Sequence, residues 1–228
     1  MEPPPWPSRK LLVIGDSVTC GEGVDRGTDC TKSKFSMSNG YDSYGMLLAR
    51  HLDAQCHLAC FGGRGLIRDW RGDTDVLTGP QLFDLALPDE GEGPPAPHWD
   101  HATYTPDAVV VSLGTNDFNL SIGPLPTHEA FVPAYVTFVR TIRRRYPKAH
   151  VFLTEGAIVH DGDPDGPRPR TVLRDYIDAT IAELADPFVH HAAATHFPGD
   201  ECDAHPTGEQ HRRMAQELEA QLRAALGW

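Results

Sequence analysis

The sequence predicts an α/β fold: a three-layer α/β/α sandwich built around a five-stranded parallel sheet. The chain has 228 residues, of which 40% are hydrophobic, and this suits one domain with a substantial core. Short apolar runs of the kind buried in parallel sheets alternate with stripes of apolar residues at helical spacing. Such alternation is typical of a parallel sheet covered by helices on both faces.

The expected strands are the apolar runs 10–14, 55–59, 108–113, 150–153 and 188–192. Helices are expected after the last three runs, where apolar residues recur every three or four positions and mark core-facing sides. Their stripes are Phe131, Tyr135, Phe138 and Ile142; Leu173, Ile177, Ile181 and Leu184; and His211, Met214, Leu218 and Leu222. We expect residues 1–9 to form an N-terminal tail and residues 10–228 to form a single domain.

Local signals place the remaining segments. Thr207 and Gln210 have the spacing of a capping box and predict that the last helix begins directly after His205-Pro206. Two stretches, 88–97 and 161–169, are rich in Pro, Gly and acidic residues and are expected to be irregular surface loops.

A candidate catalytic triad joins the two ends of the chain. Ser17, in Gly15-Asp16-Ser17, follows an apolar run and is therefore expected at the carboxyl end of a strand, where ligands bind in open α/β sheets. A serine hydroxyl needs a neighbouring imidazole to accept its proton, and His205 is the candidate base. Asp203 precedes it by two positions and would orient the ring and stabilise the imidazolium. A main-chain carbonyl is the alternative orienting group.

Two further blocks supply candidate donors to an oxyanion. Gly62-Gly63-Arg64-Gly65 and Gly114-Thr115-Asn116-Asp117 lie between the serine and the histidine. The backbone N–H groups of Ser17 and Gly63 and the side-chain amide of Asn116 form the expected oxyanion hole, in which each donor is worth about 3 kcal/mol. Glycine allows the main chain to approach a substrate closely, and spacing alone leaves Gly62 and Gly65 as alternatives to Gly63.

These four blocks, in this order, resemble the SGNH hydrolases, also called the GDSL esterase/lipase superfamily, from Gly15 to the C-terminal helix. Residues 15–23, 65–69 and 112–118 are similar to the catalytic domain of carbohydrate esterase family two, whose members remove acetyl groups from sugars. The resemblance assigns the oxyanion glycine to Gly63. It implies a serine esterase that deacetylates a small molecule, such as a sugar or glycosylated metabolite, through an acyl-serine intermediate. That family usually has a β-sandwich domain before the hydrolase domain, whereas nine residues precede the first strand here, which disfavours polymer substrates.

Several alternatives stay open at this point. The same fold can hydrolyse longer acyl esters or thioesters, or transfer the acyl group to a second hydroxyl. From a different class comes a non-catalytic carbohydrate-binding protein. Trp70, Trp99 and Phe118 suit either sugar stacking or a core. A zinc site is the competing interpretation of the cluster His190, His191, His196, Cys202 and His205, but helical His-x-x-x-His spacing is missing and we expect no metal or cofactor.

Charge and hydropathy limit the partners. The net charge of -12 and the lack of a basic cluster beyond residues 143–145 argue against a nucleic-acid partner. No apolar run approaches the roughly 20 residues of a membrane span, so no membrane association is expected. The expected partner is a small-molecule ester substrate, and the oligomeric state is left open.

The N-terminal residues and the cysteines indicate in which cellular compartment the protein is expected. Residues 1–7 lack the basic and apolar regions of a signal peptide, so a cytoplasmic location is expected, with a trimmed secreted chain as the alternative. Five cysteines, at positions 20, 30, 56, 60 and 202, have neither metal-ligand spacing nor a disulfide framework. We expect most of them to be reduced, with Cys56 and Cys60 as core thiols that flank a strand.

Overall fold

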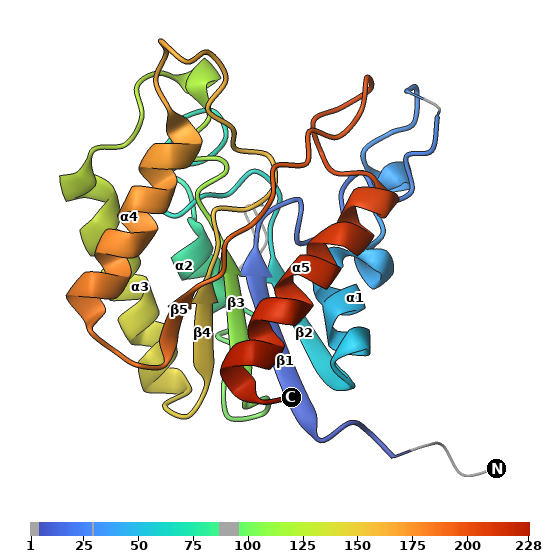
Figure 1. The fold of residues 1–228 in the computed structure, drawn as a ribbon, viewed down its shortest axis with the longest axis vertical. Helices are drawn as coiled ribbons and strands as arrows, with labels where there is room; N and C mark the ends of the chain where they lie inside the picture. Colours follow the sequence, from blue (N-terminus) through green and yellow to red (C-terminus); the bar gives the residue numbers. More distant parts are fainter. Residues whose placement is uncertain (1–4, 29, 87–95) are drawn as a thin grey trace.

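The computed structural model describes residues 5–28, 30–86 and 96–228, which form an α/β sandwich (Figure 1). Its sheet is five-stranded and parallel throughout, with the order β2-β1-β3-β4-β5. The strands are β1 (Arg9–Gly15), β2 (Ala54–Cys60), β3 (Ala108–Ser112), β4 (His150–Leu153) and β5 (Val189–His191). All five predicted strands are confirmed, with ends that differ from the prediction by one residue at most.

Helices cover both faces of the sheet. On one face lie α1 (Tyr44–His51) and α5 (Gly208–Leu226), and on the other lie α3 (His128–Arg145) and α4 (Pro169–Leu184) (Figure 1). The three long helices agree with the predicted stripes. Neither α1 nor the short α2 (Gly79–Phe83) was predicted, because helices of eight and five residues give little helical periodicity to recognise.

The core consists of two apolar clusters separated by the sheet. Along β1, Leu12 and Ile14 join the cluster under α3 and α4, whereas Leu11 and Val13 join the cluster under α1 and α5. Successive side chains of a strand point to opposite faces, so a strand covered on both sides must be apolar at every position. This explains why the central strands read as continuous apolar runs.

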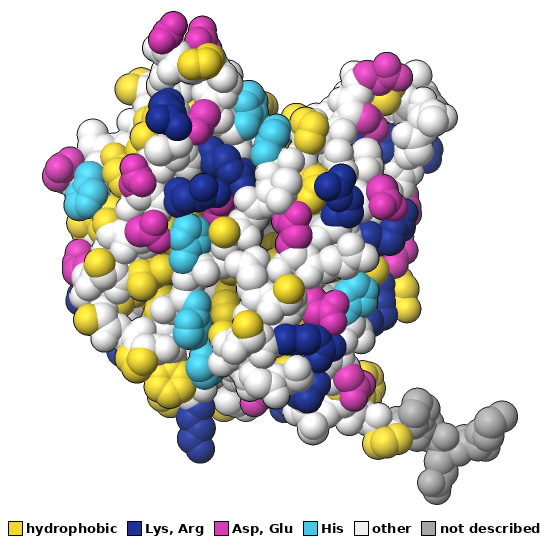
Figure 2. Space-filling model, in the orientation of Figure 1, with side chains coloured by type: hydrophobic (Ala, Val, Ile, Leu, Met, Phe, Trp, Pro, Cys, Tyr) yellow, Lys and Arg dark blue, Asp and Glu magenta, His cyan; other side chains and the backbone are white. Residues whose placement is uncertain are grey.

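The carboxyl ends of all five strands point to the same edge of the molecule, and the loops that follow them form two projections (Figures 1 and 2). One projection contains the loop between β4 and α4, which includes most of the predicted loop 161–169. The other contains the segment after β1 and the loop that leads from β5 into α5. The predicted loop 88–97 lies largely outside the described residues.

The start of α5 fixes the end of this second loop. Thr207 accepts a hydrogen bond from the backbone N–H of Gln210, and the Gln210 side chain accepts one from the backbone N–H of Thr207. This capping box satisfies N–H groups that the first helical turn leaves free. The predicted helix start is confirmed, and His205 lies just before it.

The expectation of mostly reduced cysteines was wrong. The structure pairs Cys20 with Cys60 and Cys30 with Cys202, and it leaves Cys56 free. The partners are 40 and 172 residues apart, so local spacing carries no signal of the pairing. The fold brings them together at the carboxyl edge of the sheet, where their Cα atoms lie 5.5 and 5.0 Å apart, within the usual range for a disulfide.

In the described parts of the chain, no helix has both the length and the apolar character of a membrane span.

Candidate active site

A chain of hydrogen bonds joins the three predicted triad residues. The Oγ atom of Ser17 lies 2.9 Å from Nε2 of His205, although the residues are 188 positions apart. On the other side of the ring, Nδ1 of His205 lies 2.5 Å from Oδ1 of Asp203. This arrangement allows His205 to accept the serine proton while Asp203 holds the ring.

The local backbone explains how Ser17 is presented. The chain turns immediately after β1, where the N–H of Cys20 donates to the carbonyl of Asp16 at 3.1 Å and that of Glu22 donates to the carbonyl of Ser17 at 3.0 Å. Gly15 permits this turn, since a Cβ there would lie 2.1 Å from Oγ1 of Thr19. The first N–H groups of a helical turn have no partner within it, so the N–H of Ser17 is available to an incoming oxyanion.

Asp203 remains ionised in this setting. Burial alone would raise its pKa, but hydrogen bonds from the backbone and ring of His205 and the charge of Arg26 lower the pKa below its usual value. The backbone N–H of His205 donates to Asp203 Oδ1 at 2.7 Å. Asp203 is therefore a turn residue and the orienting carboxylate at once, and no main-chain carbonyl is needed for that task.

Asn116 is held by Asp16, a residue with no predicted role. Its Nδ2 donates to Oδ2 of Asp16 at 3.2 Å and to the carbonyl of Arg64 at 3.1 Å. Burial raises the pKa of Asp16 to about 6, although its hydrogen bond from the N–H of Val18 and the charge of His205 act in the opposite direction. The aspartate of Gly15-Asp16-Ser17 thus orients the amide at the cavity wall. Both Nδ2 hydrogens are engaged within the protein, so Asn116 donates to an oxyanion only when a ligand replaces one of these two acceptors.

Hydrogen bonds within the block 62–65 distinguish which of its glycines has a backbone N–H available to an oxyanion. The N–H of Gly65 donates to the carbonyl of Arg68 at 3.0 Å, which commits it to the protein. Gly62 and Gly63 line the cavity beside Ser17, and Gly63 has a φ of +77°, a conformation that favours glycine. These contacts favour Gly63 and Gly62 over Gly65 as oxyanion donors.

Asp117 is a second residue whose role was missed. Its carboxylate is fully buried and accepts hydrogen bonds from the N–H groups of Leu66, Ile67 and Arg68 at 2.7, 2.8 and 3.2 Å. It thereby ties the loop after β2 to the loop after β3. Its position next to Asn116 in one sequence block was a signal that could have been used.

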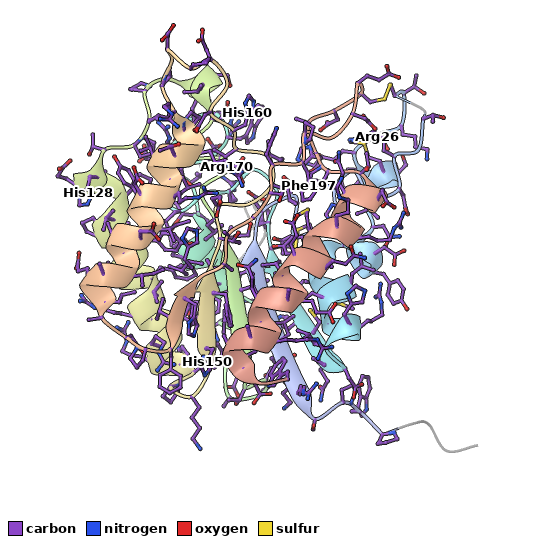
Figure 3. All side chains as sticks on the ribbon, viewed as in Figure 1. Arg26, His128, His150, His160, Arg170 and Phe197 are labelled. Carbon is purple, nitrogen blue, oxygen red and sulfur yellow. A yellow bond between two sulfur atoms is a disulfide. The ribbon has the colours of Figure 1, made fainter. Side chains whose placement is uncertain are left out.

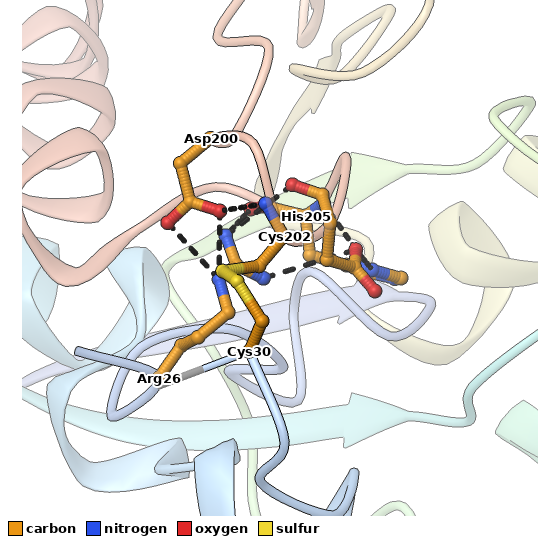
Figure 4. The surroundings of a disulfide bond; sticks show 6 residues. Arg26, Cys30, Asp200, Cys202 and His205 are labelled. Carbon is orange, nitrogen blue, oxygen red and sulfur yellow. Dashed lines mark hydrogen bonds and ion pairs between the residues drawn. A yellow bond between two sulfur atoms is a disulfide. The ribbon is translucent and has the colours of Figure 1, made fainter. Parts of the chain in front are cut away.

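Arg26 and a disulfide hold the loop that carries Asp203 and His205 (Figure 4). Arg26 is 1% exposed, and its Nη2 donates to the carbonyl of His205 at 2.7 Å. Its Nε donates to Asp200 at 3.1 Å, and its Nη1 lies 3.8 Å from Oδ1 of Asp203. The Cys30–Cys202 disulfide connects the same two segments. No motif in the sequence marks Arg26 for this task.

A cavity of about 630 Å³ opens beside Ser17, between the two projections (Figure 2). Of the three aromatic residues considered for sugar stacking, Trp70 lines this cavity and is 56% exposed. Phe118 also borders it but is 2% exposed and packs against Phe131 in the core. Trp99 lies elsewhere, beside His57. Trp70 is thus the one of the three that offers a free aromatic surface to a ligand.

The loop between β4 and α4 forms the opposite wall, and Arg170 holds it in place (Figure 3). The guanidinium donates to the carbonyl of Val159 at 2.7 Å, to that of Ala194, and to the fully buried Glu155 at 3.2 Å. Burial opposes ionisation of Glu155, but hydrogen bonds from His191 and Arg174 and the charge of Arg170 lower its pKa to about 2. Arg170 thus ties the first part of this loop, at Val159, to Glu155 and to the segment that follows β5.

The comparisons with known proteins agree with this geometry. The model described as "GDSL-like Lipase/Acylhydrolase family" matches residues 13–213. The chain belongs to the GDSL-like lipase/acylhydrolase family. It is 45% identical over 225 residues to an "Acetylxylan esterase / glucomannan deacetylase" of Cellvibrio japonicus (strain Ueda107), covering 99% of this chain and 59% of that protein.

Solved structures of similar proteins support the fold of this GDSL-family chain. A family two carbohydrate esterase from Cellvibrio japonicus has a TM-score of 0.90 and 43% identity, covering 100% of this chain and 64% of that one. A family two carbohydrate esterase from Clostridium thermocellum, solved with cellohexaose, has a TM-score of 0.81 and 30% identity, covering 100% of this chain and 67% of that one. The chain therefore spans less than two thirds of the length of the Cellvibrio japonicus relatives and about two thirds of the Clostridium thermocellum structure.

The structure separates the residues of the zinc interpretation in this family member. His190 lies against His150, with their ring nitrogens 2.8 Å apart, while His191 contacts Glu155 and Asp178. His196 contacts the carbonyl of Ala157, Cys202 is in a disulfide and His205 contacts Ser17. Within the ranges that the structure describes, no three His, Cys, Asp or Glu side chains are grouped as metal ligands.

Proposed function

We propose that this chain is a serine esterase that removes acetyl groups from a small O-acetylated molecule such as a sugar or glycosylated metabolite. The observation that carries the proposal is the continuous contact from Ser17 through His205 to Asp203 at the wall of the cavity. Family membership and the names of the relatives, which include acetylxylan esterase, support the same chemistry.

The geometry supports a mechanism with two acyl-transfer steps. His205 accepts the Ser17 proton through Nε2 while Oγ attacks the acyl carbon, and the carbonyl π electrons move onto the oxygen. The N–H groups of Ser17 and Gly63 stabilise this oxyanion, and the amide of Asn116 becomes a third donor when it exchanges one of its two protein acceptors for the oxyanion. Its collapse breaks the ester C–O bond, and His205 returns the proton to the departing alcohol. Water then opens the acetyl-serine by the same route and releases acetate.

The cavity supports an alcohol part larger than the acyl group. A volume of about 630 Å³ far exceeds what an acetyl group requires, so most of it is available to the alcohol. Trp70 offers an exposed aromatic surface at the wall, a property suited to the apolar face of a sugar ring. The relative solved with cellohexaose is consistent with a sugar at this site, and we extend that likeness to this chain as part of the proposal.

We also propose that the enzyme works in an oxidising compartment instead of the cytoplasm. Disulfides persist outside the reducing cytosol, and this chain contains two. One of them connects the loop that carries His205 to the segment after β1.

The direct experiment uses p-nitrophenyl esters from acetate to octanoate at pH 7 to 8, with wild type and Ser17→Ala, each with and without EDTA. We expect the highest turnover on acetate, its loss by about a million-fold in Ser17→Ala, and no effect of the chelator. Higher turnover on octanoate would favour a longer-acyl esterase. Full activity of Ser17→Ala, or loss of wild-type activity in EDTA restored by zinc, would contradict the proposal.

A further inference from the structure

A lysine lies at the cavity wall next to the nucleophile. Lys34 lines the cavity with Ser17 and Gly62. A Cβ placed on Gly62 would lie 3.3 Å from Nζ of Lys34 and 3.7 Å from Cβ of Ser17. The ammonium group therefore rests against the backbone of Gly62, on the side of the cavity where the ester must bind. Among the described residues that line this cavity, Lys34 is the only lysine or arginine.

A buried carboxylate fixes this ammonium in place. Oε2 of Glu22 lies 3.0 Å from Nζ of Lys34, and the Glu22 side chain is 7% exposed whereas that of Lys34 is 58% exposed. Glu22 is itself attached to the nucleophile turn through its backbone N–H, which donates to the carbonyl of Ser17 at 3.0 Å. An ammonium has three N–H donors, so the contact with Glu22 leaves donors for a ligand.

The neighbouring residues indicate what kind of ligand the ammonium meets. A Cβ placed on Gly63 would lie 2.6 Å from Cδ1 of Trp70, so Lys34 and Trp70 lie against two successive glycines. A hydrogen-bond donor beside an exposed indole suits a sugar, which has hydroxyl oxygens at its edge and C–H groups on its face. Asp161 and Asp163 line the same cavity and disfavour an anionic ligand.

We propose that Lys34 is a specificity residue that donates a hydrogen bond to an oxygen of a neutral sugar, in the alcohol part of the substrate. This inference rests on the proposed acetyl-sugar esterase function and names one residue that selects the sugar. It assigns Lys34 a role in binding the alcohol part, not in the acyl-transfer steps that Ser17 and His205 carry out.

The test compares two acetyl esters that differ in the alcohol: a methyl glucoside with a single acetyl group, and p-nitrophenyl acetate, whose alcohol has no further hydroxyl. For Lys34→Met we expect KM for the glucoside to rise about five- to tenfold, the effect of one lost hydrogen bond, with kcat within about twofold. Both constants for p-nitrophenyl acetate should stay within about twofold. Lys34→Arg should retain most of the affinity for the glucoside.

The matched control is Lys32→Met, since Lys32 donates to the carbonyl of Asp25 at 2.7 Å and does not line the cavity. This variant should leave KM and kcat unchanged for both esters. Because the Lys34 side chain is more than half exposed, its replacement is not expected to prevent folding.

Other outcomes overturn the inference in distinguishable ways. Oε2 of Glu22 also lies 3.8 Å from Nε2 of His205, so loss of Lys34 could act on the base. An equal change for both esters would show that route and contradict a role in sugar binding, as would no change for either ester. If wild type hydrolyses p-nitrophenyl acetate but not the glucoside, the sugar substrate is wrong and the inference is wrong with it.

Discussion

The guanidinium of Arg26 donates a hydrogen bond to the carbonyl oxygen of His205 at 2.7 Å, across 179 positions of sequence. The same side chain approaches Asp203 and Asp200 and is almost fully buried. The position of the proposed base therefore depends on a residue that does not border the cavity. Small displacements of a catalytic group have large effects on rate, so this contact should be visible in the kinetics.

Replacement of Arg26 by Met should lower kcat for p-nitrophenyl acetate by about 10- to 100-fold with little change in KM, because His205 loses its fixed position. It should also lower the free energy of unfolding by about 3 kcal/mol, since Asp200 and Asp203 lose a buried partner. Steady-state kinetics and urea unfolding measure the two effects. Arg50→Met is the matched control, as Arg50 pairs with Asp42 at the surface. A folded Arg26→Met enzyme with wild-type kcat would refute the positioning role.

The disulfides give a direct chemical prediction. Unfolded protein that has not been reduced should contain one reactive thiol per chain, that of Cys56, and reduction should reveal all five. The double variant Cys30→Ser, Cys202→Ser should lose about 2 to 5 kcal/mol of unfolding free energy, because a long loop is no longer closed in the unfolded chain. Five reactive thiols without reductant would show that the cysteines are unpaired in the isolated protein.

Asp16 should make stability depend on pH. Burial raises its pKa to about 6 from 3.8, so between about pH 4 and pH 6 the folded state binds more protons at this site than the unfolded state. Stability from Asp16 is thus greatest below pH 4 and is lost as pH rises to 6, by up to about 3 kcal/mol.

The measurement is urea unfolding of wild type and Asp16→Asn from pH 4 to pH 7. The unfolding free energy of wild type minus that of the variant should fall across this range and then stay constant above pH 6. A difference that is independent of pH would contradict the raised pKa. We also expect lower kcat in Asp16→Asn, because Asn116 loses the carboxylate that orients it.

Gly63 should tolerate no side chain. A Cβ there would lie 2.6 Å from Trp70, and the φ of +77° is unfavourable for alanine. We expect Gly63→Ala to lower kcat/KM by about 100-fold or more, through displacement of an oxyanion donor. Gly62→Ala is the matched control, since its Cβ would meet the flexible end of Lys34 at 3.3 Å, and it should cost much less. Equal losses in the two variants would argue against Gly63 as the specific donor.

The sequence by itself determined the fold class and the chemical groups of the candidate site. Apolar runs and helical stripes identify strands and long helices because burial on a strand or helix follows the period of that element. The motifs around Ser17, Asn116 and His205 could be recognised because each is short and continuous in the chain. The helix α1 was not predicted, because its eight residues form only about two turns and show too little helical periodicity.

Only the tertiary structure decided which distant residues meet. The pairing of Cys30 with Cys202, the support of His205 by Arg26 and the approach of Lys34 to Gly62 all join segments that no local pattern connects. These contacts arise because parallel strands bring their carboxyl ends to one edge and the order β2-β1-β3-β4-β5 sets which loops are neighbours. Strand order results from the packing of the whole chain, so residue type and spacing do not determine it.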